Sequence, residues 1–129
     1  MIRGFTRSPP TEEKALIQAM SASSRILNAS LRGKIMSATE AAAFIQDGHN
    51  VGMSGFTGAG YPKAVPLALA KQMDVAHAAG QNFRIGMWTG ASTAPELDGA
   101  LARANGVDMR MPYQSDPTCR KRINAGEMD

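Results

Sequence analysis

Short apolar segments and helix-forming segments alternate along most of this chain. The apolar segments have the length of strands and cover residues 50–54, 83–88 and 107–111. Helical patterns surround them at residues 41–46, 65–79, 97–104 and from 117 onward. Strands that alternate with helices pair in parallel, and the loops after the strands then gather along one edge of the sheet. The sequence therefore predicts an α/β fold, a parallel sheet with flanking helices.

Several residues mark the ends of these helices. Ser37 and Glu40 have the spacing of a capping box, in which each side chain bonds a free backbone N–H at a helix start. Asp116 precedes Pro117 and can cap the last helix. Gly80 is expected to end the helix at 65–79.

The helix at 65–79 carries one apolar face. Val65, Leu69, Met73 and Ala76 lie three or four positions apart and should pack on the sheet. Aromatic residues make up only 5% of the chain, so aliphatic side chains, alanines and nine methionines must fill the core. Trp88 is expected in that core or in a pocket wall.

The composition excludes several classes of protein. A chain of 129 residues with 43% hydrophobic and 19% charged residues fits one globular domain. No apolar run is long enough for a membrane span, and no paired Cys or His spacing suggests a metal site. The net charge is +3, but no aromatic platform accompanies the basic residues 120–122, so nucleic acid is not an expected partner. We expect a cytoplasmic protein.

Two regions are expected. Residues 1–24 form a peripheral tail with a short helical run at 11–20, and residues 25–129 form the α/β domain. Three strands would leave an exposed sheet edge, which intact domains normally cover. We therefore expect a truncated domain or a partner that covers the edge.

The nine residues SGFTGAGYP, at 54–62, follow the first strand. Gly55, Gly58 and Gly60 permit positive φ angles and leave backbone N–H groups accessible to an oxyanion or a carboxylate. A tight turn without a ligand would need the same glycines. The spacing differs from the dinucleotide and Walker A fingerprints, which disfavours NAD and ATP.

Three strings follow one another at spacings that match the three loops after the strands. They are VGMSGFTGAGYPKAVPLALA, IGMWTGASTAPELDGALARANGV and SDPTCRKRINAGE. Together they resemble the start of the acetyl-CoA hydrolase/transferase family, in particular its succinyl-CoA:acetate CoA-transferases. The resemblance implies a CoA-transferase-like (NagB/RpiA-like) fold, of which this chain is an incomplete amino-terminal domain. It also implies a homodimer for the complete protein.

The resemblance implies an enzyme that moves coenzyme A between an acyl-CoA and a small carboxylate through a glutamyl-CoA thioester, with acetyl-CoA hydrolysis as a side reaction. The nucleophilic glutamate would belong to a missing carboxy-terminal half. No residue of this chain is therefore assigned as catalytic, no metal or cofactor is expected, and coenzyme A is a substrate. The isolated chain should be inactive.

The same resemblance assigns one wall of a carboxylate pocket to this chain. Gly58, Ala59 and Gly60 would line it with backbone, and Ser92 and Ser115 would donate hydroxyl hydrogen bonds. Local loop or capping bonds are the alternative explanation for both serines, and they favour a structural role more for Ser115 than for Ser92. A further alternative is a non-catalytic binding module that pairs with a separate carboxy-terminal half.

Other reactive residues are expected to be structural. Glu40 belongs to a cap, Glu96 to a helix start and Glu127 to the last residues. Cys119 follows a helix start and precedes three basic residues, features that can lower a thiol pKa.

Overall fold

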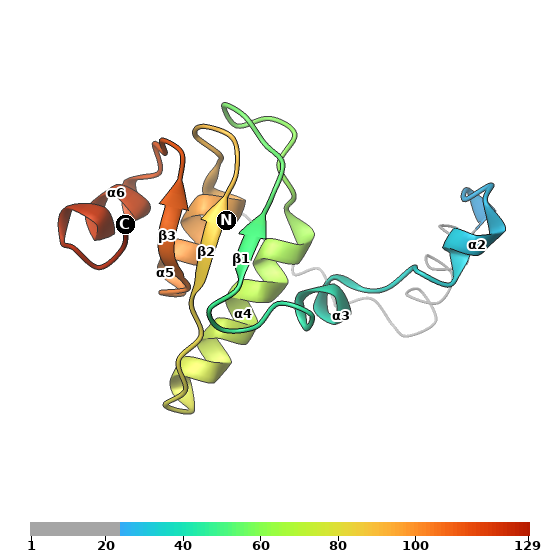
Figure 1. Ribbon diagram of the computed structural model, residues 1–129, viewed down its shortest axis with the longest axis horizontal. Coiled ribbons are helices and arrows are strands. Elements are labelled where there is room, and N and C mark those ends of the chain that lie inside the picture. Colours follow the sequence, from blue (N-terminus) through green and yellow to red (C-terminus); the bar gives the residue numbers. More distant parts are fainter. Residues whose placement is uncertain (1–23) are drawn as a thin grey trace, which may run out of the picture. The chain divides into compact units, whose positions relative to one another are not determined.

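The computed structural model describes residues 24–129 (Figure 1). The chain divides into two units, Met1–Met36 and Ser37–Asp129. The predicted tail, apart from Ser24, and its helical run at 11–20 lie outside the described residues. The described part of the first unit contains helix α2 (Ala29–Arg32), which Asn28 caps by accepting a hydrogen bond from the Ser30 N–H at 3.1 Å.

The second unit alternates helices and strands in the predicted order. Its elements are α3 (Ala38–Ala42), β1 (Asn50–Gly52), α4 (Ala64–Ala78), β2 (Ile85–Trp88), η1 (Pro95–Gly99), α5 (Ala100–Arg103), β3 (Val107–Met111) and α6 (Pro117–Asn124). The three strands form a parallel sheet in the order β1-β2-β3. The predicted α/β class and parallel pairing are confirmed.

The helix ends follow the sequence signals. Ser37 and Glu40 form both bonds of the capping box, at 3.2 and 2.7 Å. Asp116 accepts hydrogen bonds from two N–H groups at the start of α6. Gly80 has a φ of +73° directly after α4, and its N–H donates to the carbonyl of His77 at 2.9 Å. These local signals were sufficient because each depends on neighbouring residues only.

Two strands are shorter than predicted. β1 ends at Gly52 rather than 54, although the N–H of Met53 still donates to the carbonyl of Trp88 at 2.8 Å. β2 begins at Ile85 rather than 83. The predicted helix at 97–104 begins at Pro95, and its first part, η1, is a π-helix rather than an α-helix. Apolar spacing does not distinguish these two helix types.

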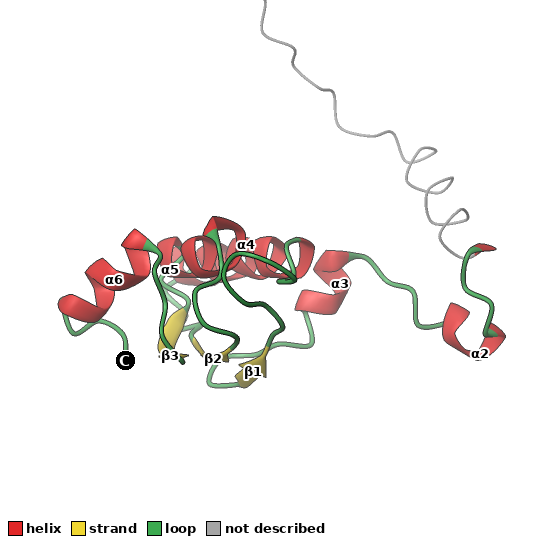
Figure 2. Ribbon diagram, turned by 90° about the horizontal axis from the view of Figure 1, so that it is seen from above, coloured by secondary structure: helices red, strands yellow, loops and turns green. Residues whose placement is uncertain are grey.

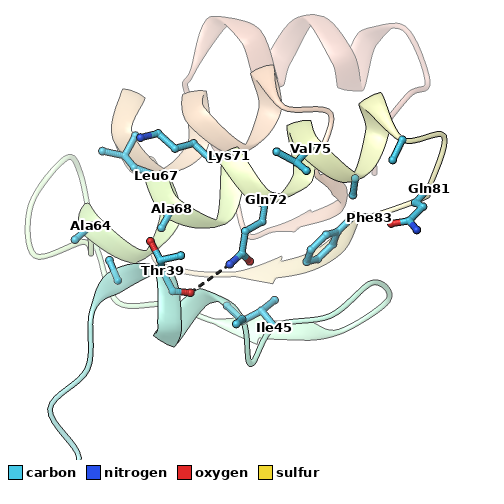
Figure 3. A pocket seen from close by; sticks show the side chains of 14 residues that line it. Thr39, Ile45, Ala64, Leu67, Ala68, Lys71, Gln72, Val75, Gln81 and Phe83 are labelled. Atoms are coloured by element: carbon cyan, nitrogen blue, oxygen red, sulfur yellow. Dashed lines mark hydrogen bonds between the residues drawn. The ribbon is translucent and has the colours of Figure 1, made fainter.

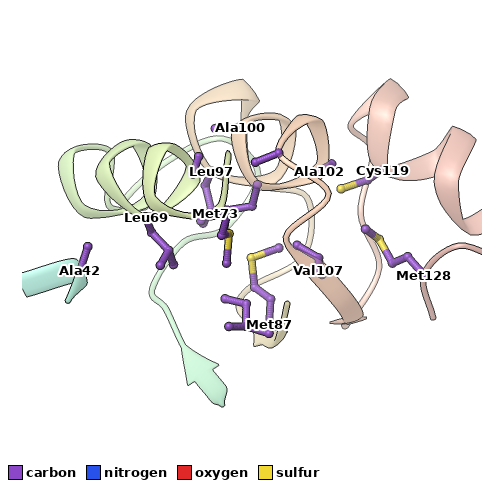
Figure 4. Packing of buried hydrophobic residues seen from close by; sticks show 14 residues of the cluster. Ala42, Leu69, Met73, Met87, Leu97, Ala100, Ala102, Val107, Cys119 and Met128 are labelled. Atoms are coloured by element: carbon purple, nitrogen blue, oxygen red, sulfur yellow. The ribbon is translucent and has the colours of Figure 1, made fainter. Parts of the chain in front are cut away.

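Helices α4 and α5 lie against one face of the sheet (Figures 1 and 2). Leu69, Met73, Met87 and Val107 meet in the core between these layers (Figure 4). Leu69 and Met73 are fully buried, as predicted for that face of α4. Full burial of one such side chain contributes roughly 1.5–3 kcal/mol, so the core fixes α4 on the sheet.

Trp88 does not lie in the core. It is 48% exposed, and its indole Nε1–H donates to Asn50 Oδ1 at 3.1 Å. Side chains alternate along a strand, and Ile85 and Met87 already point toward the helices, so Trp88 points to the opposite face. The apolar character of Trp88 alone could not give this direction.

The outer edge of β3 is partly paired. The N–H of Arg110 donates to the carbonyl of Asp129 at 2.6 Å, and the N–H of Asp129 donates to the carbonyl of Asp108 at 2.8 Å. Met128 beside this pairing is buried. The last residues of the chain thus cover part of the edge that was expected to be exposed.

Within residues 24–129, no helix combines the length and the apolar character needed to cross a membrane.

Candidate functional site

The loops that follow the three strands meet at the carboxyl edge of the sheet (Figure 1). They cover residues 53–63, 89–94 and 112–116. In open parallel sheets this edge is where ligands bind. The loops therefore define the first candidate site.

Backbone hydrogen bonds join the first loop to the second. The N–H of Thr57 donates to the carbonyl of Ala91, and the N–H of Gly58 donates to the carbonyl of Ser92, both at 2.9 Å. The N–H of Ser92 in turn donates to the carbonyl of Tyr113 in the third loop at 2.9 Å. The three loops thus form one connected layer above the strands.

Two glycines allow the first and second loops to approach this closely. A Cβ atom at Gly90 would lie 1.5 Å from the carbonyl oxygen of Gly55. Gly55 has a φ of +137°, and a Cβ atom there would lie 2.8 Å from Cγ2 of Thr93. Any side chain at either position would separate the loops.

Ser92 and Ser115 come together in this layer. Their Oγ atoms form a hydrogen bond in which either hydroxyl can be the donor. Ser92 has a φ of +63°, which is uncommon for a residue other than glycine. Such a conformation costs about 1–3 kcal/mol and persists only where its surroundings hold it, often at functional sites.

A hollow of about 390 Å³ lies beside the two hydroxyls. The residues around it come from all three loops and from the starts of η1 and α6: Thr57, Gly58, Ser92, Thr93, Ala94, Pro95, Ser115, Asp116 and Pro117. Three of the five residues assigned to the carboxylate pocket, Gly58, Ser92 and Ser115, line this hollow. Ala59 and Gly60 do not line it.

Several hydrogen-bonding groups of the glycine-rich loop already have partners within the protein. The N–H of Gly58 donates to Ser92, and the N–H of Ala59 donates to the carbonyl of Phe56 at 2.9 Å. The carbonyl of Gly60 accepts a hydrogen bond from the Ser54 hydroxyl at 2.8 Å. In this conformation the N–H groups of Gly58 and Ala59 hold the loop, and the side-chain hydroxyls offer the polar contacts of the hollow.

A buried ion pair lies beneath the loops. Asp98 and Arg110 have fully buried side chains, with Nε of Arg110 2.9 Å from Asp98 Oδ1. The same guanidinium donates to the carbonyl of Gly90 at 3.1 Å and to that of Pro112 at 3.0 Å. Arg110 therefore connects the second and third loops from below. Sequence reasoning missed this pair, because its two members are twelve positions apart in different elements.

Thr93 was also missed. It is only 4% exposed, and its Oγ1 has no hydrogen-bond partner among the described residues. Its position next to Ser92 in the TGAST string was the available signal, but a string does not reveal which hydroxyl lacks a partner.

A second contact joins the first loop to η1. The Tyr61 hydroxyl donates to Glu96 Oε2 at 2.8 Å, and Lys63 Nζ lies 3.4 Å from Glu96 Oε1. The hydrogen bond from Tyr61 lowers the pKa of Glu96 most, and a bond from its own backbone N–H and the contact with Lys63 act in the same direction. Hydrogen bonds with Tyr61 and Glu96 raise the pKa of Lys63. Glu96 is thus a charged acceptor that fastens the loop.

Cys119 does not have the lowered pKa that its basic neighbours suggested. Burial raises the pKa of this thiol to about 12, and the nearby charges of Asp98 and Asp116 act in the same direction. Its Sγ donates to the carbonyl of Asp98 at 3.4 Å. A nucleophilic role is therefore disfavoured, because the thiolate is the reactive form.

A larger hollow of about 760 Å³ lies between α3 and α4 (Figure 3). Leu67, Val75 and Phe83 give it an apolar wall, and Gln72 Nε2 donates to the carbonyl of Thr39 at 3.2 Å. It has Lys71 as a charged group but none of the hydroxyls of the carboxyl edge. Three of the residues assigned to the carboxylate pocket line the smaller hollow, and none of the five lines this one.

Within residues 24–129, no group of three or more His, Cys, Asp or Glu side chains is arranged to hold a metal ion.

Known proteins resemble most of this chain. The acetyl-CoA hydrolase/transferase N-terminal domain family matches residues 20–129. A succinyl-CoA:acetate CoA-transferase of Clostridium kluyveri is 41% identical over 104 residues, which are 81% of this chain and 19% of that protein. A propanoyl-CoA:succinate CoA transferase of Escherichia coli is 44% identical over 91 residues, 70% of this chain and 18% of that protein.

An acetyl-CoA hydrolase of Schizosaccharomyces pombe is 36% identical over 107 residues, 82% of this chain and 20% of that protein. The chain thus spans about one fifth of the length of these relatives. The names of the relatives describe enzymes that transfer coenzyme A or hydrolyse acetyl-CoA. The family that the three strings indicated is confirmed, and this chain belongs to the acetyl-CoA hydrolase/transferase family, matching its N-terminal domain.

Proposed function

We propose that this chain supplies one wall of the carboxylate site in an enzyme that transfers coenzyme A between an acyl-CoA and a small carboxylate such as acetate. The observation that carries the proposal is the pair of hydroxyls, Ser92 and Ser115, beside a hollow at the carboxyl edge of the sheet. The relatives named as CoA-transferases support the reaction class. Succinyl-CoA and acetyl-CoA are the proposed donors.

The two serines bind rather than react. Without a ligand, one hydroxyl uses the other as its acceptor. A carboxylate accepts hydrogen bonds on both of its oxygens, so each serine can donate to it once their mutual bond opens. Hydrogen bonds to a charged group are worth about 1.5–3 kcal/mol each, which favours this exchange.

The bond-making step belongs to a glutamate outside these 129 residues. Its carboxylate attacks the acyl-CoA thioester, releases the CoA thiolate and forms an acyl-glutamyl anhydride. The thiolate then attacks the glutamyl carbonyl and releases the first carboxylate, which leaves a glutamyl-CoA thioester. A second carboxylate reverses these two steps and departs as the new acyl-CoA. Water in place of that carboxylate gives hydrolysis.

Three further parts of the proposal concern the complete protein. The fold would be CoA-transferase-like (NagB/RpiA-like), with the missing carboxy-terminal half providing the glutamate and most contacts to coenzyme A. The complete enzyme would be a homodimer and act in the cytoplasm. Gly58 would line the wall beside the hydroxyl pair, and Ala59 and Gly60, which do not line the hollow, would shape the same loop next to it.

A complementation assay tests this function. The purified 129-residue chain is incubated with acetyl-CoA and succinate, alone and after co-expression with the remaining part of the C. kluyveri relative. We expect no transfer by the chain alone and transfer by the pair. In the pair, Ser92→Ala and Ser115→Ala should raise KM for the carboxylate about tenfold each, the loss of one hydrogen bond to a charged group.

The exposed residue Ser30 provides a matched control, because Ser30→Ala removes a hydroxyl outside the second unit. Transfer by the chain alone would contradict the absence of a catalytic residue. Unchanged KM in both serine variants of an active pair would contradict the assigned wall. Carboxylate binding without transfer in any pairing would favour the alternative, a binding module.

A further inference from the structure

We propose that Thr93 is a third hydroxyl donor to the carboxylate, and that its hydroxyl is kept without a protein partner for this purpose. This inference rests on the proposed function, since it assigns an additional contact to the same ligand. It goes further because it predicts opposite effects of one substitution on stability and on binding.

The burial of Thr93 gives the first argument. The residue is 4% exposed, and its Oγ1 has no partner among the described residues. A buried hydroxyl without a hydrogen bond destabilises the folded chain, and most such groups in proteins are paired. A hydroxyl with a purely structural role would be expected to bond a neighbouring carbonyl.

The position of Thr93 gives the second argument. It lines the same hollow as Ser92 and Ser115, whose hydroxyls already contact each other. Its methyl group packs closely against Gly55, where a Cβ atom would lie 2.8 Å from Cγ2. The methyl group therefore lies beside the first loop, and the residue forms part of the lining of the hollow.

The backbone before Thr93 gives the third argument. Ser92 has a φ of +63° and Thr57, which also lines the hollow, has a φ of +47°. Backbone bonds hold both: Ser92 to Tyr113, and Thr57 to Ala91. Strained residues held in this manner gather at ligand sites. Two such residues beside an unpaired buried hydroxyl indicate a site prepared for a ligand.

A carboxylate has the acceptor capacity that three hydroxyls require. Its two oxygens offer about four lone-pair sites, so Thr93 can donate to it without displacing either serine. The bound anion would then satisfy the buried hydroxyl, and the penalty of leaving it unpaired would disappear on binding.

Thermal unfolding of the full 129-residue chain tests the inference. Thr93→Val replaces the hydroxyl with a methyl of similar size, and Thr93→Ser keeps the hydroxyl as a matched control. Each protein is melted in increasing sodium acetate, against sodium chloride at the same ionic strength. The acetate-specific rise in Tm gives the affinity.

Without acetate, we expect Thr93→Val to melt at the same temperature as the unmodified chain or higher, because an unpaired buried hydroxyl has been removed. Its affinity for acetate should fall about tenfold or more. Thr93→Ser should retain most of the affinity. A lower Tm for Thr93→Val without acetate would overturn the inference, since it would reveal a structural partner for the hydroxyl.

Failure of the two proposals can be distinguished. Acetate binding that is equal in the unmodified chain and in Thr93→Val overturns the role of Thr93 and leaves the serine wall intact. An unmodified chain with no acetate-specific rise in Tm contradicts the carboxylate wall itself, and the inference fails with it.

Discussion

Arg110 joins the second and third loops of the candidate site from below. Its guanidinium is buried, paired with Asp98, and bonded to carbonyls of two loops. An unpaired buried charge is much more costly than a buried pair. The contribution of Arg110 is therefore positional, because it fixes the loops that carry Ser92 and Ser115.

Arg110→Met should destabilise the chain by roughly 3–5 kcal/mol, because it leaves the Asp98 carboxylate buried without its partner. Adding Asp98→Leu removes that carboxylate and should recover much of the loss. Urea unfolding of both variants measures the difference. Lys121→Met, on the exposed side of α6, serves as the control and should change stability by no more than about 0.5 kcal/mol. Equal losses in the single and double variants would contradict a charge-pairing role.

Ser92 and Thr93 show which residues of the candidate site can be identified from the sequence and which cannot. Ser92 and Ser115 were identified by resemblance, because their strings match a family. Thr93 and the Asp98–Arg110 pair required the structure, since burial and the absence of a partner depend on residues far away in the chain. The direction of the Cys119 pKa shift required the structure for the same reason: adjacent charges were visible in the sequence, but burial was not.

At the scale of elements, the helix ends are set by local hydrogen bonds. Ser37→Ala removes the cap of α3 and should cost about 1 kcal/mol. The hydrogen bond from the Ser37 N–H lowers the pKa of Glu40 below its ordinary value of 4.5. A lowered carboxyl pKa stabilises the folded chain above pH 4.5, and this contribution is lost as the pH falls through the lower, folded pKa.

Chemical unfolding at a series of pH values checks this prediction. The stability difference between the unmodified chain and Glu40→Gln, which keeps the shape and removes the charge, should be constant near neutral pH and shrink below pH 4.5. A difference that grows on acidification would contradict the assigned bond.

The order and type of most helices and strands could be predicted from the sequence, because hydrophobic periodicity and helix capping are both short-range signals. The boundaries of β3 agree with the prediction, and those of β1 and β2 differ by two residues at one end. The π-helical start at Pro95 could not be predicted, since it depends on how η1 packs against α4 and α6, which are distant in the chain.

At the scale of the second unit, three parallel strands carry their helices on one face (Figure 2). Alternation of strands and helices was sufficient to predict the parallel order. It did not predict that Trp88 and Met111 would be about half exposed on the other face. Parallel sheets are usually covered on both faces, and the relatives are about five times longer than this chain. Coverage of this face by further polypeptide is consistent with the proposed complete enzyme.

The central claim is that the hydroxyl pair at the carboxyl edge of the sheet binds a carboxylate. Backbone amide spectra of the ¹⁵N-labelled chain, recorded during titration with acetate at constant ionic strength, test it most directly. We expect saturable shifts at Gly58, Ser92 and Ser115, which are lost in the Ser92→Ala, Ser115→Ala double variant. Amides beside the α3–α4 hollow, such as those of Lys71 and Val75, should not shift. Absence of saturable shifts at the three residues, or shifts confined to the α3–α4 hollow, would contradict the claim.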